Sequence, residues 1–226
     1  EAFYLSERFR MPVSVLADQL ITDGFEDISV PENEDEMKEM GFRTWPRKHC
    51  TGPEFYPFTD ELDIPPVQMG MGTGGLCSDW TPTIEGYDIE EVENHHQHAY
   101  RLIYKVRNHQ DLFNHHYEKK YMDDDPDLVV VSFGTPSRVV NTAVEKARSQ
   151  GLKVGSLRLI TLWPFPDEHF TKSTKYLSVE LNWDGQLVRE IQRATPKGSD
   201  VHFMGTCGDL PTISDLIETF EKVIND

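Results

Sequence analysis

Apolar runs and helical patterns alternate along the C-terminal part of the chain. The runs are continuous rather than alternating with polar residues, which is typical of strands that a parallel sheet buries on both faces. The strand-like runs are LVVVSFG, KVGSLRLITLWPFP, TKYLSVEL and DVHFMG, and the helical segments between and after them are PSRVVNTAVEKARSQG, DGQLVREIQRA and TISDLIETFEKVI. This order predicts a three-layer α/β domain with a mostly parallel sheet over residues 123–226. The run DDDPD, in which Pro126 prevents a helix from continuing, marks its start.

The chain opens with a helical pattern that is followed by a strand-like run. Ala2, Leu5 and Phe9 recur at near-helical spacing. Met11–Asp18 is apolar enough to predict a buried strand, with Pro12 tolerable only at its start. This pair could complete a sheet whose other strands are absent, so we expect the chain to be the later part of a longer polypeptide.

Residues 24–90 show no sustained periodicity. They contain seven prolines and the glycine-rich run MGMGTGG at Met69–Gly75. That run lacks the Lys-Ser/Thr pair of a P-loop and neither follows a clear strand nor opens a clear helix, so we interpret it as flexible linker rather than as a phosphate site. A structureless connection of this length is uncommon unless it is functional. We therefore predict an extended linker that wraps surfaces.

Helical character returns in residues 91–122. Ala99, Leu102, Ile103 and Val106 fall on one stripe of the predicted helix. We expect this segment to bridge the linker and the C-terminal domain.

Composition and charge exclude several classes of protein. The chain has 226 residues, 38% of them hydrophobic, and a formal net charge of -17, which disfavours nucleic acid or an anionic membrane as a partner. No apolar run approaches the length of a membrane span, so we expect a cytoplasmic protein. Cys50, Cys77 and Cys207 form no CxxC pair. We therefore expect neither a disulfide framework nor a thiolate metal site, and we place any iron-sulfur cluster on another chain.

Histidines gather around the predicted bridging helix. His95, His96 and His98 precede it, and His115 and His116 follow it. Imidazoles at such spacing can ligate zinc, but neither Glu nor Cys stands at a known partner spacing. Solvent-exposed or interface histidines are the favoured interpretation, and we predict no metal site.

Two strand-to-helix junctions carry the candidate functional residues. In SFGTPS, Gly134 permits a tight turn before a helix whose N-terminus could hold an anion, although ordinary capping explains the same residues. In YLSVELNWDGQLVREIQ, Glu180, Asn182, Gly185 and Gln186 fall at the carboxyl end of a predicted strand, where ligands and partners collect in open parallel sheets. These residues could meet another subunit or a cofactor, or could only tie down the turn through local hydrogen bonds.

Four blocks, in this order, resemble the alpha subunit of a 2-oxoacid:ferredoxin oxidoreductase, most closely the 2-oxoglutarate type. They are AFYLSERFRMPVSVLADQL, HHQHAYRLIYKV, VVVSFGTPSRVVNTAVEKARSQGLKVGSLRLITLWPFP and YLSVELNWDGQLVREIQ. The resemblance implies the tail of a pyrimidine-binding-type thiamine domain at 1–23 and a transketolase C-terminal-like domain at 123–226, separated by the linker at 24–90 and the bridging segment at 91–122.

The resemblance also implies an activity and its cofactors. Enzymes of this family oxidatively decarboxylate a 2-oxoacid with coenzyme A as co-substrate and pass electrons to ferredoxin. Thiamine diphosphate and magnesium lie at the interface with a beta subunit, and iron-sulfur clusters lie on partner chains; gamma and delta subunits are further candidate partners. The family's catalytic carboxylate and main substrate contacts belong to a region that precedes Glu1. The resemblance therefore implies that this chain alone is inactive and binds no cofactor by itself, and it assigns no catalytic residue within the chain.

Other hypotheses remain open at this point. The linker has GLCSDWTPTIEG where the family often has Thr-Gly-x-x-His, so pyruvate and branched-chain oxoacids stay as alternative substrates. A beta-type chain of a 2-oxoacid dehydrogenase, which delivers its product to a lipoyl carrier, is another alternative. A non-catalytic α/β interaction module is the alternative from a different class.

Overall fold

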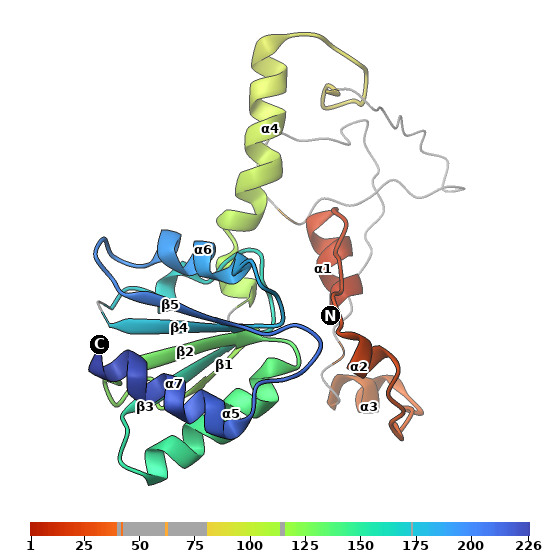
Figure 1. Ribbon diagram of the computed structural model, residues 1–226. Coiled ribbons are helices and arrows are strands. Elements are labelled where there is room, and N and C mark those ends of the chain that lie inside the picture. Colours follow the sequence, from red (N-terminus) through yellow and green to blue (C-terminus); the bar gives the residue numbers. More distant parts are fainter. Residues whose placement is uncertain (40–41, 43–61, 63–80, 114–115, 173) are drawn as a thin grey trace. The chain divides into compact units, whose positions relative to one another are not determined.

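The computed structural model describes residues 1–39, 42, 62, 81–113, 116–172 and 174–226 (Figure 1). MGMGTGG, Cys50, Cys77 and His115 lie outside these residues. The chain forms two compact units. The first unit consists of Glu1–Leu16 and Phe25–His109, and the second consists of Ala17–Gly24 and Gln110–Asp226. The boundaries predicted from the family resemblance differ from this division and stay a prediction.

The second unit is built on a five-stranded sheet with the order β1-β3-β2-β4-β5 (Figure 1). Strands β2, β3, β4 and β5 run parallel to one another, and β1 pairs antiparallel with β3 at the edge. The predicted mostly parallel sheet is therefore confirmed. The strands are β1 (Tyr117–Lys120), β2 (Leu128–Phe133), β3 (Val154–Leu159), β4 (Lys175–Glu180) and β5 (Val201–Gly205).

Helices cover both faces of this sheet. Helices α5 (Pro136–Ser149) and α7 (Ile213–Asn225) pack on one face, and α6 (Gln186–Ala194) packs on the other (Figure 1). Strand β2 shows why, since Leu128 and Val130 point to the α5/α7 core and Val129 and Val131 point to the α6 core. Because every second residue of an apolar strand faces the same way, a continuous apolar run needs two helical layers. The three-layer α/β class is thus confirmed.

Local chemistry fixes where the covering helices begin and end. Pro136 occupies the first turn of α5, and Gly151, at φ 92°, follows its end as the sequence predicts. At α7, the Thr212 side chain accepts from the Asp215 N–H and the Asp215 carboxylate accepts from the Thr212 N–H, which forms a capping box. The shorter elements of this unit are α2 (Gln19–Thr22), η1 (Gln110–Phe113) and η2 (Asp167–His169).

The first unit contains α1 (Ala2–Phe9), α3 (Glu34–Glu39) and α4 (Val92–Arg107). Lys105, which is 4% exposed, donates from Nζ to the carbonyl oxygens of Phe9 at 2.8 Å and Arg10 at 3.5 Å. A cation at the end of α1 therefore satisfies carbonyls that have no partner within that helix. None of the described helices in either unit combines the length and apolar character that crossing a bilayer requires.

Two local predictions are wrong. Met11–Asp18 is not a strand, and Val15 and Leu16 are each more than 75% exposed; among the described residues no strand pairs with it, and an apolar run without a ladder cannot form a sheet. The predicted stripe of α4 is also wrong at two positions. Leu102 and Ile103 are about half exposed, whereas Val106 is buried as predicted and the neighbouring Lys105 is buried as well.

Candidate functional site at the carboxyl edge of the sheet

Glu180 lies at the carboxyl end of β4 and is 1% exposed. Its carboxylate accepts four hydrogen bonds. Oε1 accepts from Ser178 Oγ at 2.8 Å and from the Val188 N–H at 3.2 Å. Oε2 accepts from Asn182 Nδ2 at 2.9 Å and from the Leu187 N–H at 3.0 Å. Because two of these donors are backbone N–H groups in the first turn of α6, the carboxylate satisfies a helix terminus from inside the domain.

Asn182 orders the turn between β4 and α6. Its Oδ1 accepts from the Asp184 N–H at 3.1 Å and from the Gly185 N–H at 2.7 Å. Gly185 has φ 65°, a left-handed conformation that favours glycine. On the neighbouring strand, a methyl group at Gly205 would overlap the Asn182 carbonyl oxygen, so only glycine fits there. The turn is held both by hydrogen bonds and by close backbone packing.

The local hydrogen-bond alternative therefore accounts for Glu180 and Asn182. The side chains that this turn presents outward are different ones. Trp183 is 73% exposed, and Gln186 is also exposed. A rigid turn that exposes a tryptophan has the properties of an interface anchor, and an interface role for this cluster stays a prediction.

The second junction, between β2 and α5, is closed by a residue that the sequence did not point to. Asp18 Oδ2 accepts from the Thr135 N–H at 2.7 Å and, over a shorter contact, from the Thr135 hydroxyl. Gly134 has φ 61°, and a Cβ there would lie 2.8 Å from Asp18 Oδ2. Glycine is thus required by both the backbone conformation and the approach of the carboxylate. The negative charge at this helix N-terminus is therefore supplied by the Asp18 carboxylate of the chain itself.

These contacts limit which ligands can bind at the carboxyl edge of the sheet. A carboxylate of this chain sits at the N-terminus of α5, and another sits at that of α6. A diphosphate would have to displace a buried or half-buried carboxylate to reach either terminus. Within the described ranges no group of three or more His, Cys, Asp or Glu side chains could hold a metal ion.

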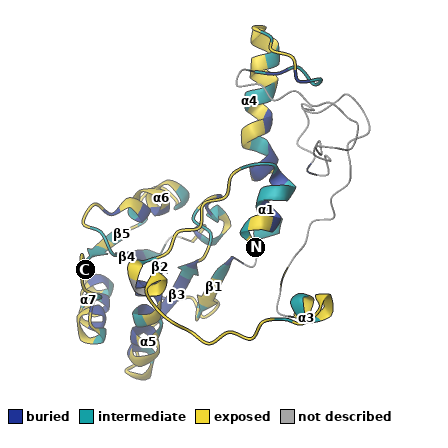
Figure 2. Ribbon diagram, turned by 90° about the vertical axis from the view of Figure 1, so that its right-hand side faces the viewer, coloured by how far each residue is buried: buried dark blue, intermediate teal, exposed yellow. Residues whose placement is uncertain are grey.

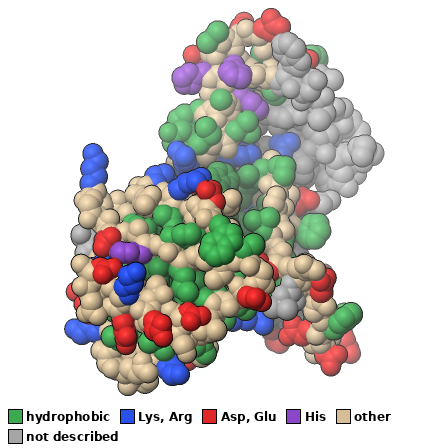
Figure 3. Space-filling view, in the orientation of Figure 1, with side chains coloured by type: hydrophobic (Ala, Val, Ile, Leu, Met, Phe, Trp, Pro, Cys, Tyr) green, Lys and Arg blue, Asp and Glu red, His purple; other side chains and the backbone are tan. Residues whose placement is uncertain are grey.

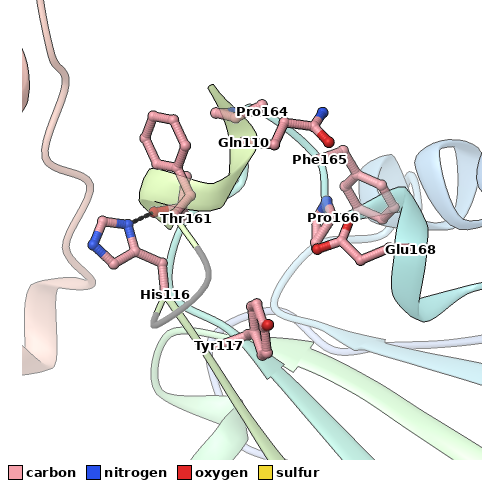
Figure 4. A pocket seen from close by; sticks show the side chains of 9 residues that line it. Gln110, His116, Tyr117, Thr161, Pro164, Phe165, Pro166 and Glu168 are labelled. Atoms are coloured by element: carbon pink, nitrogen blue, oxygen red, sulfur yellow. Dashed lines mark hydrogen bonds between the residues drawn. The ribbon is translucent and has the colours of Figure 1, made fainter. Parts of the chain in front are cut away.

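A small hollow lies beyond β3 at the same edge (Figure 4). A hydrogen bond of 2.6 Å joins Nδ1 of buried His116 and Thr161 Oγ1, and Tyr117 and Glu168 also line the hollow (Figure 4). Its volume is about 10 Å³, which is room for one water molecule. It is too small to bind a 2-oxoacid. Burial, and then the charge of Lys119, lowers the pKa of nearby His169, whereas Glu168 raises it.

His95, His96 and His98 lie within α4 rather than before it, and in the part of the chain that the structure describes they belong to no group of three possible metal ligands. His95 Nδ1 forms a hydrogen bond with Thr81 Oγ1 at 2.7 Å, and His96 is exposed. Burial, followed by the neighbouring cations of the same helix, lowers the pKa of His98.

One protein family and several known proteins are similar to this chain in sequence. Residues 126–216 match the family "Pyruvate:ferredoxin oxidoreductase core domain II". The chain is 35% identical to the 2-oxoglutarate synthase subunit KorA of Methanothermobacter marburgensis, over 99% of the chain and 58% of that protein. It is 26% identical to the ketoisovalerate oxidoreductase subunit VorB of Methanothermobacter thermautotrophicus, over 100% of the chain and 56% of that protein. The chain thus spans a little more than half the length of these curated relatives.

Among solved structures, the chain resembles the 2-oxoglutarate:ferredoxin oxidoreductase of Magnetococcus marinus, determined with 2-oxoglutarate, coenzyme A and succinyl-CoA bound. The TM-score is 0.71 at 22% identity, and the match covers 86% of this chain and 34% of the other. At this level of identity the match shows a shared fold.

Proposed function

We propose that this chain, which is 35% identical over 99% of its length to a 2-oxoglutarate synthase subunit, is the alpha-subunit portion of a 2-oxoacid:ferredoxin oxidoreductase. The enzyme oxidatively decarboxylates 2-oxoglutarate with coenzyme A and reduces ferredoxin. Three 2-oxoglutarate synthase subunits, at 31–35% identity, support this substrate. The ordering is not uniform, because two ketoisovalerate oxidoreductase subunits are 26–27% identical and the 2-oxoglutarate synthase subunit of Archaeoglobus fulgidus is 23% identical.

The proposed role of this chain is to hold other parts of the complex rather than to carry the chemistry. The residues at the carboxyl edge do not fit thiamine diphosphate with magnesium, because carboxylates of the chain already occupy the N-termini of α5 and α6. We therefore assign the diphosphate and its magnesium to a companion beta subunit, and iron-sulfur clusters to partner chains. No catalytic step is assigned to a residue of this chain.

The carboxyl edge is the proposed contact surface for the companion beta subunit. Glu180, Asn182 and Gly185 hold the turn in shape, and Trp183 and Gln186 face outward from it. Gly134 shapes the neighbouring junction in the same way. A turn that is already ordered before binding loses little conformational entropy when it docks, which favours affinity.

Reconstitution tests the proposal. The polypeptide that contains this chain is co-expressed with its companion beta subunit and supplied with thiamine diphosphate, magnesium and coenzyme A. We expect 2-oxoglutarate to drive viologen reduction faster than pyruvate or 3-methyl-2-oxobutanoate does, and we expect the isolated chain to give no reduction. Failure with every 2-oxoacid contradicts the proposal, and a requirement for a lipoyl protein instead of direct dye reduction favours a dehydrogenase.

A further inference from the structure

The chain contains two Asp–Gly pairs, Asp23–Gly24 and Asp184–Gly185. An Asp–Gly pair can isomerise without an enzyme. The glycine nitrogen attacks Cγ of the aspartic acid, a C–N bond forms, and the carboxyl hydroxyl leaves with the amide proton as water. The resulting succinimide takes up water again. When the bond between the glycine nitrogen and the former main-chain carbonyl breaks, the chain continues through Cγ as isoaspartate. Glycine favours the attack because it has no Cβ to crowd the nitrogen.

The attack requires a peptide plane that can turn. The glycine nitrogen and the aspartate Cγ must come within about 3 to 3.5 Å of each other with their orbitals aligned. A glycine N–H that is held by a good acceptor in a fixed turn opposes this rotation, whereas a fraying helix end permits it. The hydrogen bonds of the two glycine N–H groups therefore indicate which pair can react.

Asp184–Gly185 is held by the turn that Asn182 orders. Asn182 Oδ1 accepts from the Gly185 N–H at 2.7 Å and from the Asp184 N–H at 3.1 Å. Gly185 is buried, and a Cβ there would lie 3.3 Å from the Phe203 ring. Arg189 Nη2 lies 2.9 Å from Asp184 Oδ2, which holds the carboxylate toward α6. Turning this peptide would break the 2.7 Å hydrogen bond inside a packed site.

Asp23–Gly24 lies at the end of α2 and is held much less firmly. The Gly24 N–H donates to the Ile21 carbonyl oxygen at 3.3 Å, which is a long hydrogen bond. Asp23 and Gly24 are exposed, and so is the extended stretch that follows them as far as Val30 (Figure 2). Helix α2 has four residues, and a helix this short is marginal. This peptide can therefore turn at little cost.

The charges around the two pairs differ in the same direction. Residues 18–37 contain no Lys or Arg, and acidic side chains gather over α3, later in the chain (Figure 3). The neighbouring sequence therefore offers the Asp23 carboxylate no cation of the kind that Arg189 provides for Asp184. The Asp23 side chain can rotate toward the Gly24 nitrogen.

We propose that Asp23 is a site of spontaneous isoaspartate formation in the folded protein, and that the Asn182 turn protects Asp184 from the same reaction. The modification leaves the mass unchanged but adds a main-chain methylene between α2 and the extended stretch after it. Neither site depends on the identity of the substrate or of a companion subunit, so both stand whether or not the proposed function holds.

Ageing of the complete polypeptide tests the proposal. The protein is incubated at physiological temperature, and isoaspartate at each site is quantified by peptide mass spectrometry with electron-transfer fragmentation. We expect isoaspartate to form at Asp23 at least tenfold faster than at Asp184, because only the second pair is held by the fold. In strong urea, which removes the fold, we expect the two rates to become similar. Equal rates in the folded protein, or a difference that stays as large in urea, overturn the proposal.

Asn182→Ala tests the protecting turn, and Asn33→Ala is its matched control. Asn33 Oδ1 accepts from the Asp35 N–H and the Glu36 N–H, each at 3.0 Å, so it orders the start of α3 in a similar way. We expect Asn182→Ala to speed isoaspartate formation at Asp184 at least fivefold, and Asn33→Ala to change that rate less than twofold. An unchanged rate at Asp184 in Asn182→Ala overturns the protection. Circular dichroism checks that both variants are folded, and the comparison in urea decides if Asn182→Ala is not.

Gly24→Ala tests the reaction at the other site. Gly24 is exposed, so the added methyl group leaves the packing unchanged. Because a Cβ next to the attacking nitrogen hinders the reaction, we expect isoaspartate formation at Asp23 to slow at least fivefold. Formation at Asp184 serves as the internal reference and should not change. If Asp23 is modified as fast in Gly24→Ala as in wild type, or not at all in wild type, the assignment of Asp23 is overturned.

Discussion

The carboxylate of Asp18 accepts hydrogen bonds from both the backbone N–H and the hydroxyl of Thr135, although 117 residues separate them. This contact attaches Ala17–Gly24 to the α/β sheet and gives α5 its N-terminal acceptor. The hydrogen-bond acceptor for this helix N-terminus thus comes from a segment that is distant in sequence. The stability of the α/β domain therefore depends on the position of Ala17–Gly24.

We therefore expect Asp18→Ala to destabilise the second unit by about 1 to 2 kcal/mol, which is the usual effect of losing a carboxylate or cap at a helix N-terminus. Asp18→Asn keeps one acceptor oxygen but no charge, so it should lose less. Urea unfolding of the three proteins measures the difference. An unchanged free energy of unfolding in Asp18→Ala would mean that the contact contributes nothing.

Glu180→Gln should be more damaging than its similar shape suggests. Glutamine replaces one acceptor oxygen with an NH2 donor, which then faces donors from Ser178 and Val188 or from Asn182 and Leu187. Buried donors left without an acceptor cost about 1 to 3 kcal/mol, and more when the lost acceptor was charged. Chemical unfolding provides the measurement.

The matched control for that substitution is Glu190→Gln on the exposed side of α6. Glu190 pairs only with exposed Arg193, at 2.8 Å. Exposed ion pairs contribute about 0 to 1 kcal/mol, so the control should stay near wild type. If Glu180→Gln and Glu190→Gln lower the free energy of unfolding equally, the hydrogen bonds of Glu180 contribute no more than an exposed ion pair.

Gly205→Ala tests the close packing under the Asn182 turn. The added methyl group would overlap the Asn182 carbonyl oxygen and the Phe203 ring, so the turn must move. We expect a loss of about 2 kcal/mol or more, since relieving such an overlap needs a backbone shift. Gly208→Ala is the comparison, because it meets nothing within 4 Å and isolates the effect of a left-handed glycine at φ 93°. Thermal unfolding should rank Gly205→Ala as the less stable protein.

The sequence correctly predicts the elements that can be recognised from the pattern of their own residues. Strands β2, β3 and β4 are apolar throughout and need two covering layers, so their pattern is visible without a structure. The resemblance to 2-oxoacid:ferredoxin oxidoreductases agrees with the 35% identity to a 2-oxoglutarate synthase subunit and with the family match of residues 126–216. The capping glycine at Gly151 was predicted for the same reason.

What was missed depends on distant partners. Strand β1, with the sequence YEKK, is a polar edge strand that is recognisable only through its pairing with β3. Asp18 was assigned to a strand because nothing nearby in sequence reveals its bond to Thr135. Lys105 is buried because it binds carbonyls at the end of α1, so a rule that places only apolar residues inside finds Val106 but misses Lys105.

The buried Lys105 gives a prediction for pH. Burial, and then the charges of Arg101 and Arg10, lowers the pKa of Lys105 to about 8. The unfolded chain, with an ordinary lysine pKa of about 10.4, binds a proton between these two values that the folded chain does not bind. Stability from this group therefore rises with pH across about pH 8 to 10.

We expect the free energy of unfolding of wild type, relative to Lys105→Met, to rise by about 1 to 3 kcal/mol between pH 7.5 and pH 10. The methionine variant removes the titrating group while keeping a long side chain, so other groups cancel in the comparison. A difference that stays flat or falls with pH would contradict a lowered pKa at this lysine.

Trp183 is the side chain through which the ordered turn can reach a partner. Its neighbours Asn182 and Gly185 are fixed by hydrogen bonds, but the indole itself is 73% exposed. Trp183→Ala should therefore leave the free energy of unfolding within about 0.5 kcal/mol of wild type, as surface substitutions do. Binding to the companion beta subunit should weaken by about 2 kcal/mol, or roughly thirtyfold, as for a buried tryptophan anchor. Tyr87→Ala removes an aromatic that is 64% exposed in the other unit and serves as the control. If Trp183→Ala and Tyr87→Ala bind the companion subunit equally well, the turn has only a structural role. If Trp183→Ala remains folded and it alone binds more weakly, the hydrogen-bonded turn holds Trp183 in place for binding.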